Sequence, residues 1–245
     1  MVKSKRLRVF AGPNGSGKTT LANKLIENGE FNASAFVNAD EIEREIGSKN
    51  GLDFSQYHLT LELNPLKQYF QNYGMSLSKT EDDKIPEKFA TDGGRLKYSG
   101  IINSYIASDL AAYVREQLLA NGENFWFETV FSHTSKLEIM KKARDLGYRI
   151  YFYFIATDAP EINIDRVNNR VAKNGHPVPE DKIRSRYYRS LDLLLPAIKI
   201  SDRAFLFDNS QKASRYLCEI AKGQNVTMKT KDVPNWFIDF VYGKK

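Results

Sequence analysis

The chain is poor in cysteine, with Cys218 as the one example among 245 residues. A lone cysteine excludes a disulfide scaffold and any zinc cluster built on cysteine pairs. The chain also lacks an uncharged apolar run near the roughly 18 residues that a membrane-spanning helix needs. Its first residues, MVKSKRLRVFAG, do not form the apolar stretch of a signal peptide. A cytoplasmic protein with no membrane segment is therefore expected.

The positive charge of the chain is unevenly distributed. The net charge is +6, against an ordinary globular composition of 42% hydrophobic and 27% charged residues. The segment from Arg166 to Arg189 contains seven basic residues, opposed only by Glu180 and Asp181. Such a local excess favours capture of a compact anion such as a polyphosphate and argues against a nucleic-acid partner. A solvated helix face would show the same pattern.

Stretches rich in β-branched and aromatic residues alternate with helical patterns along the chain. Strands are expected over residues 7–11, 35–38, 124–130, 149–156 and 203–207. Helices are expected over residues 16–28, 102–120, 136–146, 160–173, 180–195 and 211–222. This alternation predicts an α/β fold in which a mostly parallel, five-stranded sheet is buried by helices on both faces.

One region breaks the alternation. Residues 47–99 contain Pro65, Pro86, the pair Gly93-Gly94 and a short acidic patch. The front half of this region predicts one or two helices, and the back half is typical of a polar loop. Because the region is short for an independent core, we expect a single domain over residues 1–245 with an insertion at about 47–99.

The most specific motif is a glycine-rich loop that satisfies G-x-x-x-x-G-K-[ST] between an expected strand and an expected helix. In such a loop, backbone N–H groups and the helix N-terminus surround phosphate oxygens. The lysine reaches the β- and γ-phosphates, and the threonine hydroxyl binds Mg²⁺. The sequence therefore predicts binding of ATP or GTP with Mg²⁺. The nucleotide-binding residues are Gly12, Pro13, Asn14, Gly15, Ser16, Gly17, Lys18, Thr19 and Thr20, with Lys18 also catalytic and Thr19 the metal ligand.

Several triphosphate-binding classes lack their signatures here. The chain contains neither the N-K-x-D tetrapeptide of GTPase switches nor the L-S-G-G-Q signature of ABC-type ATPases. No expected strand ends in the consecutive acidic residues typical of motors. A kinase instead needs a carboxylate near the loop to accept a proton from the acceptor, and arginines that close over the phosphates. The sequence contains candidates for both.

Two acidic residues follow expected strands, where the carboxyl ends of a parallel sheet face the ligand. Asp40 is a candidate general base for an acceptor hydroxyl, or the first residue of a capping box with Glu43 for a helix beginning at Glu41. Glu128, with Thr129, is a candidate for binding the acceptor or for holding Mg²⁺ through water. An ordinary polar strand end is the alternative for Glu128.

The basic segment predicts a helical lid over about residues 166–190. Arg166 and Arg170 share one helix face at spacing i, i+4, and Arg186 and Arg189 share another at i, i+3. The connector 174–179 is rich in turn residues, so the two helices are expected to form a hinged hairpin. His176 in that connector is more typical of a turn than of a metal site.

Four motifs, taken together, resemble the zeta-toxin-like P-loop kinases. They are the loop GPNGSGKTT, the segment NADEI, the segment FETVFS, and the pattern RVxxRVxxNGHxVPExxIRxRYxRSL, all in family order between residues 7 and 210. The likeness is strongest to a small chromosomal branch of the family.

The resemblance implies a P-loop NTPase fold with an arginine-rich lid and a kinase that phosphorylates the sugar hydroxyl of UDP-N-acetylglucosamine. An antitoxin protein is a candidate partner. By motif, Asp40 matches the base, Glu128 the substrate-binding acidic residue, and Arg170 and Arg186 the lid arginines.

Two rival functions remain open on the sequence. One is a polynucleotide or nucleoside kinase on the same scaffold, which a steep salt dependence of acceptor affinity would indicate. The other is a nucleotide-binding regulatory protein with little turnover, such as one member of a toxin–antitoxin pair.

Overall fold

The computed structural model describes residues 4–31, 34–48, 50–172 and 177–243. The chain separates into two compact units, of which the first combines Met1–Ala33 with Trp126–Lys245 and the second is Ser34–Phe125. The expected insertion at about 47–99 falls within the second unit, and the number of domains stays a prediction. Among the described residues, no helix has the length and apolar character needed to cross a lipid bilayer.

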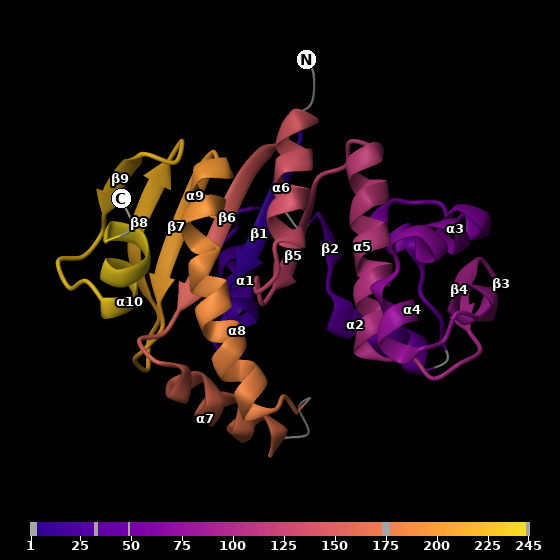
Figure 1. Ribbon diagram of the computed structural model, residues 1–245. Helices are drawn as coiled ribbons and strands as arrows, with labels where there is room; N and C mark the ends of the chain where they lie inside the picture. Colours follow the sequence, from indigo (N-terminus) through magenta and orange to yellow (C-terminus); the bar gives the residue numbers. More distant parts are fainter. Residues whose placement is uncertain (1–3, 32–33, 49, 173–176, 244–245) are drawn as a thin grey trace. The chain divides into compact units, whose positions relative to one another are not determined.

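The first unit is built on a sheet with strands in the order β5-β1-β6-β7-β8-β9. Strands β1, β6 and β7 pair in parallel, whereas β8 and β9 continue the sheet as antiparallel strands (Figure 1). The strands are β1 (Arg6–Ala11), β5 (Phe125–Thr129), β6 (Arg149–Ala156), β7 (Arg203–Asp208), β8 (Arg215–Ala221) and β9 (Asn225–Met228).

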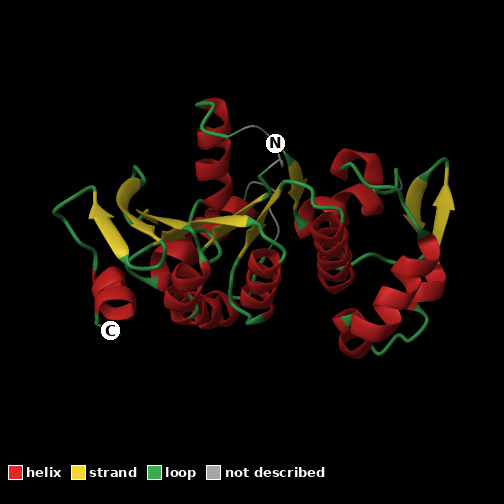
Figure 2. Cartoon of the chain, turned by 90° about the horizontal axis from the view of Figure 1, so that it is seen from above, coloured by secondary structure: helices red, strands yellow, loops and turns green. Residues whose placement is uncertain are grey.

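Helices lie on both faces of this sheet (Figure 2). Helix α1 packs against β1, while α6 and α9 pack against β6 and against each other. The helices of the unit are α1 (Lys18–Glu27), α6 (Ser135–Asp145), α7 (Pro160–Val171), α8 (Glu180–Asp192), α9 (Leu194–Ile200) and the short α10 (Asn235–Phe237), which continues into a short π-helix over Ile238–Tyr242. The predicted α/β class is therefore confirmed.

One expected helix, over residues 180–195, is divided at Leu193 into α8 and α9. Pro196 lies in the first turn of α9, where its missing N–H removes no helical hydrogen bond. Because the helix is interrupted at Leu193, Pro196 falls in the first turn of a new helix and not in the interior of one long helix, which it would disrupt.

The expected helix over residues 211–222 is wrong, because this segment forms β8. The edge of β7 presents unpaired backbone groups, and β8 satisfies them by antiparallel pairing. An ion pair between Arg215 and the buried Asp208, at 2.9 Å, joins the two strands beside their turn. The sheet thus contains two strands, β8 and β9, that were not expected from the sequence.

The second unit contains more regular structure than expected. Its elements are β2 (Ala35–Val37), α2 (Ala39–Gly47), a 3₁₀ turn at Phe54–Tyr57, α3 (Leu63–Tyr73), α4 (Met75–Thr80), a 3₁₀ turn at Ile85–Lys88, β3 (Phe89–Asp92), β4 (Arg95–Tyr98) and α5 (Ser104–Ala120). The helices expected in the front half of the insertion are confirmed by the 3₁₀ turn and α3.

The polar loop expected in the back half is wrong, because α4 and the β3–β4 hairpin occupy it. Gly93 and Gly94 both have positive φ, at 55° and 76°, which is the conformation that a two-residue hairpin turn requires. The flanking Phe89 and Leu96 are buried. The many polar residues around the glycine pair led to the loop prediction, although the buried side chains of Phe89 and Leu96 hold the segment as a hairpin.

Candidate functional site

The glycine-rich loop lies between β1 and α1, as its motif predicts. Its turn is closed by the Ser16 N–H, which donates to the Pro13 carbonyl at 3.2 Å. Gly17 is the N-cap of α1, and neither a capping side chain nor an acidic residue occupies the first turn. The N–H groups at this helix end are therefore available to an anion.

The ammonium group of Lys18 lies over the loop. Its Nζ donates to the carbonyls of Gly12 and Pro13, each at 2.9 Å. The hydroxyl of Ser16 is fully buried within the loop and has no hydrogen-bond partner in the described part of the chain. Positive charge and an unsatisfied hydroxyl in one small loop fit a phosphate group.

Thr19 and Glu128, two residues that the sequence assigned separately, are in direct contact. The Thr19 hydroxyl donates to Glu128 Oε2 at 2.7 Å. Strand β5 lies beside β1, so its carboxyl end arrives next to the start of α1. A hydroxyl and a carboxylate are hard oxygen donors, which suit Mg²⁺ when phosphates and waters supply its remaining ligands. The residues present therefore fit the metal that the motif implies.

Thr129 has a local structural contact. Its Oγ1 accepts a hydrogen bond from the Phe131 N–H at 3.1 Å. Phe131 has a φ of 60°, and the bond supports this turn after β5. The role of Thr129 in acceptor binding stays a prediction.

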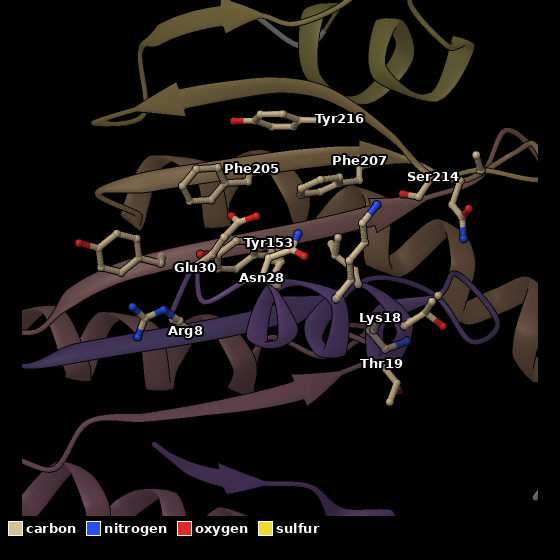
Figure 3. Close-up of a pocket in the computed structure, with 18 of the residues that line it drawn as sticks. Arg8, Lys18, Thr19, Asn28, Glu30, Tyr153, Phe205, Phe207, Ser214 and Tyr216 are labelled. Carbon is tan, nitrogen blue, oxygen red and sulfur yellow. The ribbon is translucent and has the colours of Figure 1, made fainter. Parts of the chain in front are cut away.

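A cavity of about 1260 Å³ opens beside the loop, entirely within the first unit. Basic side chains outnumber acidic ones eight to one among its lining residues, so the cavity favours an anionic ligand. Figure 3 shows Lys18 and Thr19 toward one end of this cavity and Arg8 and Glu30 toward the other.

An aromatic row forms one side of the cavity (Figure 3). Tyr153 on β6 is in register with Phe205 on β7, and their rings stack with 4.7 Å between the ring centroids. Phe207 stacks in the same way on Tyr216 of β8, at 5.0 Å. This surface was not predicted from the sequence, because β6 and β7 were interpreted as strands buried on both faces. Alternation of aromatic residues within these strands is the signal that could have indicated it.

The two arginines predicted for the lid differ in position. Arg170 on α7 lines the cavity, together with Arg166, whereas Arg186 on α8 is not among the lining residues in the described chain. Arg184 pairs with Glu161 and ties α8 to α7. The residues 173–176, which include the predicted hinge around His176, lie outside the described residues.

Asp40, the predicted base, belongs to the second unit. It does not end β2 but lies in the first turn of α2, where its side chain is exposed. Asn38 caps this helix by accepting from the Asp40 N–H at 2.8 Å. The alternative interpretation of Asp40 as the first residue of a capping box is therefore wrong, because α2 begins at Ala39 and Asn38 is its N-cap. The catalytic role of Asp40 stays a prediction.

Comparisons with known proteins give a consistent result. The Zeta toxin family model matches residues 86–216, just over half of the chain, although this span begins after the glycine-rich loop and Asp40. An uncharacterized protein of Haemophilus influenzae is 25% identical over 178 residues, which cover 73% of this chain and 89% of that protein.

Solved structures share the fold at low sequence identity. One, from the PezAT chromosomal toxin–antitoxin system of Streptococcus pneumoniae, has a TM-score of 0.50 at 14% identity and covers 88% of this chain and 71% of its own. The AvrRxo1-ORF1:AvrRxo1-ORF2 structure with sulphate ions has a TM-score of 0.55 at 13% identity, covering 94% of this chain and 62% of its own. The structure of the same pair with ATP has a TM-score of 0.52 at 13% identity and covers 93% of this chain and 61% of its own. With its glycine-rich loop, its fold and its matching family model, the chain belongs to the zeta toxin family of P-loop kinases.

Proposed function

We propose that the protein is a kinase that transfers the γ-phosphate of ATP or GTP to a hydroxyl group of a small molecule. The observation that carries the proposal is the contact of Thr19 with Glu128 beside Lys18, at the end of a basic cavity. This arrangement combines a phosphate-binding loop with an oxygen pair suited to Mg²⁺. The ATP-containing AvrRxo1 structure, which has the same fold, is in keeping with a nucleotide here.

The residues of the first unit would act on the donor. Lys18 would leave the carbonyls of Gly12 and Pro13 and contact the phosphates. Thr19, supported by Glu128, would hold the metal, which when bound neutralises charge on the phosphates. The contact with Thr19 favours this metal role for Glu128 over direct acceptor binding. Arg170, already at the cavity, would stabilise charge on the transferred group.

The residues of the second unit would act on the acceptor. Asp40 would accept the proton of the attacking hydroxyl, and its exposed carboxylate is consistent with that role. The acceptor class that the family resemblance implies is a nucleotide sugar, with UDP-N-acetylglucosamine as the first compound to assay.

The decisive experiment is incubation of the protein with γ-labelled ATP, Mg²⁺ and either UDP-N-acetylglucosamine or a small-metabolite extract, followed by mass spectrometry. We expect a new product heavier by one phosphate, formed by the wild type and absent with Lys18→Ala. Nucleotide binding without any labelled product across the extract would contradict the kinase assignment and favour a regulatory protein with little turnover.

A protein partner is proposed on the same family basis. The PezAT and AvrRxo1-ORF1:AvrRxo1-ORF2 structures come from a toxin–antitoxin system and a two-protein complex, respectively. An antitoxin would therefore be the partner of this chain. Co-expression of the protein with adjacent coding sequences, followed by size-exclusion chromatography, tests for a stable complex.

The aromatic row favours an oligonucleotide as the second candidate acceptor. Stacked aromatic side chains beside an excess of basic ones are typical of surfaces that bind single-stranded nucleic acid. A steep fall of acceptor affinity with salt concentration would support this candidate, whereas a shallow dependence would support a small acceptor.

A further inference from the structure

Two carboxamide side chains hold the glycine-rich loop from outside. Asn163 Nδ2 donates to the carbonyl of Asn14 at 2.5 Å, and Asn209 Nδ2 donates to the carbonyl of Ser16 at 2.8 Å. Asn163 lies fully buried in α7, and Asn209 directly follows β7. The loop is therefore fixed at two of its carbonyls by residues distant in sequence.

Holding these carbonyls also sets the direction of the next N–H groups. In a trans peptide, the carbonyl of one residue and the N–H of the following residue point in opposite directions within one plane. The Asn163 contact thus turns the Gly15 N–H away from α7, and the Asn209 contact turns the Gly17 N–H away from Asn209. Within the described chain, neither N–H donates to a protein acceptor, which leaves both available to phosphate.

The carboxamides are themselves held in place. The Thr157 hydroxyl donates to Asn163 Oδ1, and the Thr157 carbonyl accepts from the Tyr187 hydroxyl at 2.6 Å. The Asn209 N–H donates to the Ala156 carbonyl at 2.8 Å. Because Tyr187 belongs to α8, both helices of the predicted lid are connected through Thr157 to the Asn163 contact.

The close approach of these side chains explains two glycines of the motif. Gly15 has a φ of 73°, and an added Cβ would lie 2.8 Å from the Asn163 backbone oxygen. Gly17 has a φ of 97°, and an added Cβ would lie 2.5 Å from Asn209 Nδ2. Both positions have a left-handed backbone, which favours glycine. At Gly15 the close neighbour is backbone and leaves no room for a Cβ, whereas at Gly17 a Cβ would displace the Asn209 carboxamide.

We propose that Asn163 and Asn209 are positioning residues for phosphate binding, each orienting one N–H group of the loop. Asn163 orients the Gly15 N–H and Asn209 orients the Gly17 N–H, without either side chain having to contact the phosphate. The inference rests on the nucleotide-binding half of the proposed function and is independent of phosphate transfer to an acceptor.

The test is a titration of ¹⁵N-glycine-labelled protein with Mg²⁺ and inorganic tripolyphosphate, followed by NMR. In the wild type, the Gly15 and Gly17 resonances should both shift on binding. Asn163→Ala should reduce the shift of the Gly15 resonance on binding and leave that of Gly17 unchanged. Asn209→Ala should reduce the shift of the Gly17 resonance and leave that of Gly15 unchanged. Each variant should weaken tripolyphosphate binding about three- to tenfold, the range expected for one hydrogen bond.

Asn168→Ala is the matched control, because Asn168 is an exposed asparagine on the same helix whose Nδ2 donates to Glu180. It should leave both glycine responses and the affinity unchanged. If Asn163→Ala does not fold, Thr157→Val releases the same carboxamide and should diminish the Gly15 response. Equal responses of the two glycines in both variants, or an affinity within twofold of wild type, would overturn the proposal.

The outcome also separates this inference from the kinase assignment. Wild-type protein that binds tripolyphosphate with the expected glycine pattern but phosphorylates no acceptor would contradict only the kinase assignment. Wild-type protein that does not bind tripolyphosphate would overturn both.

Discussion

The two units differ in how completely their predicted site residues are held in place. In the first unit, Lys18, Thr19 and Glu128 already have hydrogen-bond partners within the site. In the second unit, the carboxylate of Asp40 is exposed at the start of α2, and Asn38 performs the capping. The Thr19–Glu128 pair of the donor side is thus already formed, whereas the proposed base would gain its contacts from a bound acceptor.

This difference has a chemical rationale. A phosphate chain is bound by fixed N–H groups and charges, and orienting them in advance removes the cost of reorganisation during the reaction. A general base must instead exchange a proton with a ligand that arrives and leaves, and an exposed carboxylate is suited to that exchange. Variants of each unit should therefore affect different kinetic parameters.

The largest effect is expected for Asp40→Asn. Loss of a general base lowers turnover by about 10³-fold, within the range of 10²–10⁴ for this type of catalysis. The dissociation constant of ATP should stay within about twofold of wild type, because the proposed nucleotide contacts all belong to the first unit. Steady-state kinetics and calorimetry with Mg-ATP measure the two quantities.

Glu43→Gln on the same helix is the control for Asp40→Asn, and it should retain turnover. Turnover of Asp40→Asn near the wild-type value on the true acceptor would show that the base is another residue.

A smaller effect is expected for Arg170→Ala, which removes a cation that lines the cavity. Turnover should fall about 10²-fold, as is typical when one group that stabilises transition-state charge is lost. Arg186→Ala should cost less, because Arg186 is not among the lining residues. Parallel measurements of kcat for the two variants make the comparison. A larger loss for Arg186→Ala would mean that α8 moves toward the nucleotide during catalysis.

The smallest effect is expected for Glu128→Gln. The glutamine oxygen can still accept from Thr19, but the negative charge that favours a nearby metal is removed. The Mg²⁺ concentration for half-maximal activity should rise about 10–100-fold, as is usual for residues that support a metal site. A Mg²⁺ titration of the rate measures this. An unchanged Mg²⁺ dependence with a raised acceptor KM would instead assign Glu128 to acceptor binding.

The fold was predicted well where local pattern and tertiary structure agree. The strands β1, β2, β5, β6 and β7 and helix α1 occur close to their expected positions, because each has a long periodic or β-rich pattern. The prediction over residues 211–222 was wrong, because helical and strand patterns are ambiguous in a short segment and the edge of β7 decided the outcome.

The glycine-rich loop was identified from sequence because its residues are contiguous and chemically specific. The aromatic row and the contacts of Asn163 and Asn209 were not identified, because their residues lie on separate strands and helices. Only the register of β6 with β7 brings Tyr153 beside Phe205. No local feature of the sequence distinguishes Asn163 from Asn168 on the same helix, although only Asn163 contacts the loop.

The sequence by itself determined the phosphate-binding loop and the α/β class, since both depend on residues that are neighbours along the chain. The tertiary structure decided which side chains reach the loop, as it did for Glu128, which contacts Thr19 although 109 positions separate them. The physical reason is that backbone geometry and local periodicity act over a few residues. Contacts between distant residues exist only once the strands have paired and the helices have packed on them.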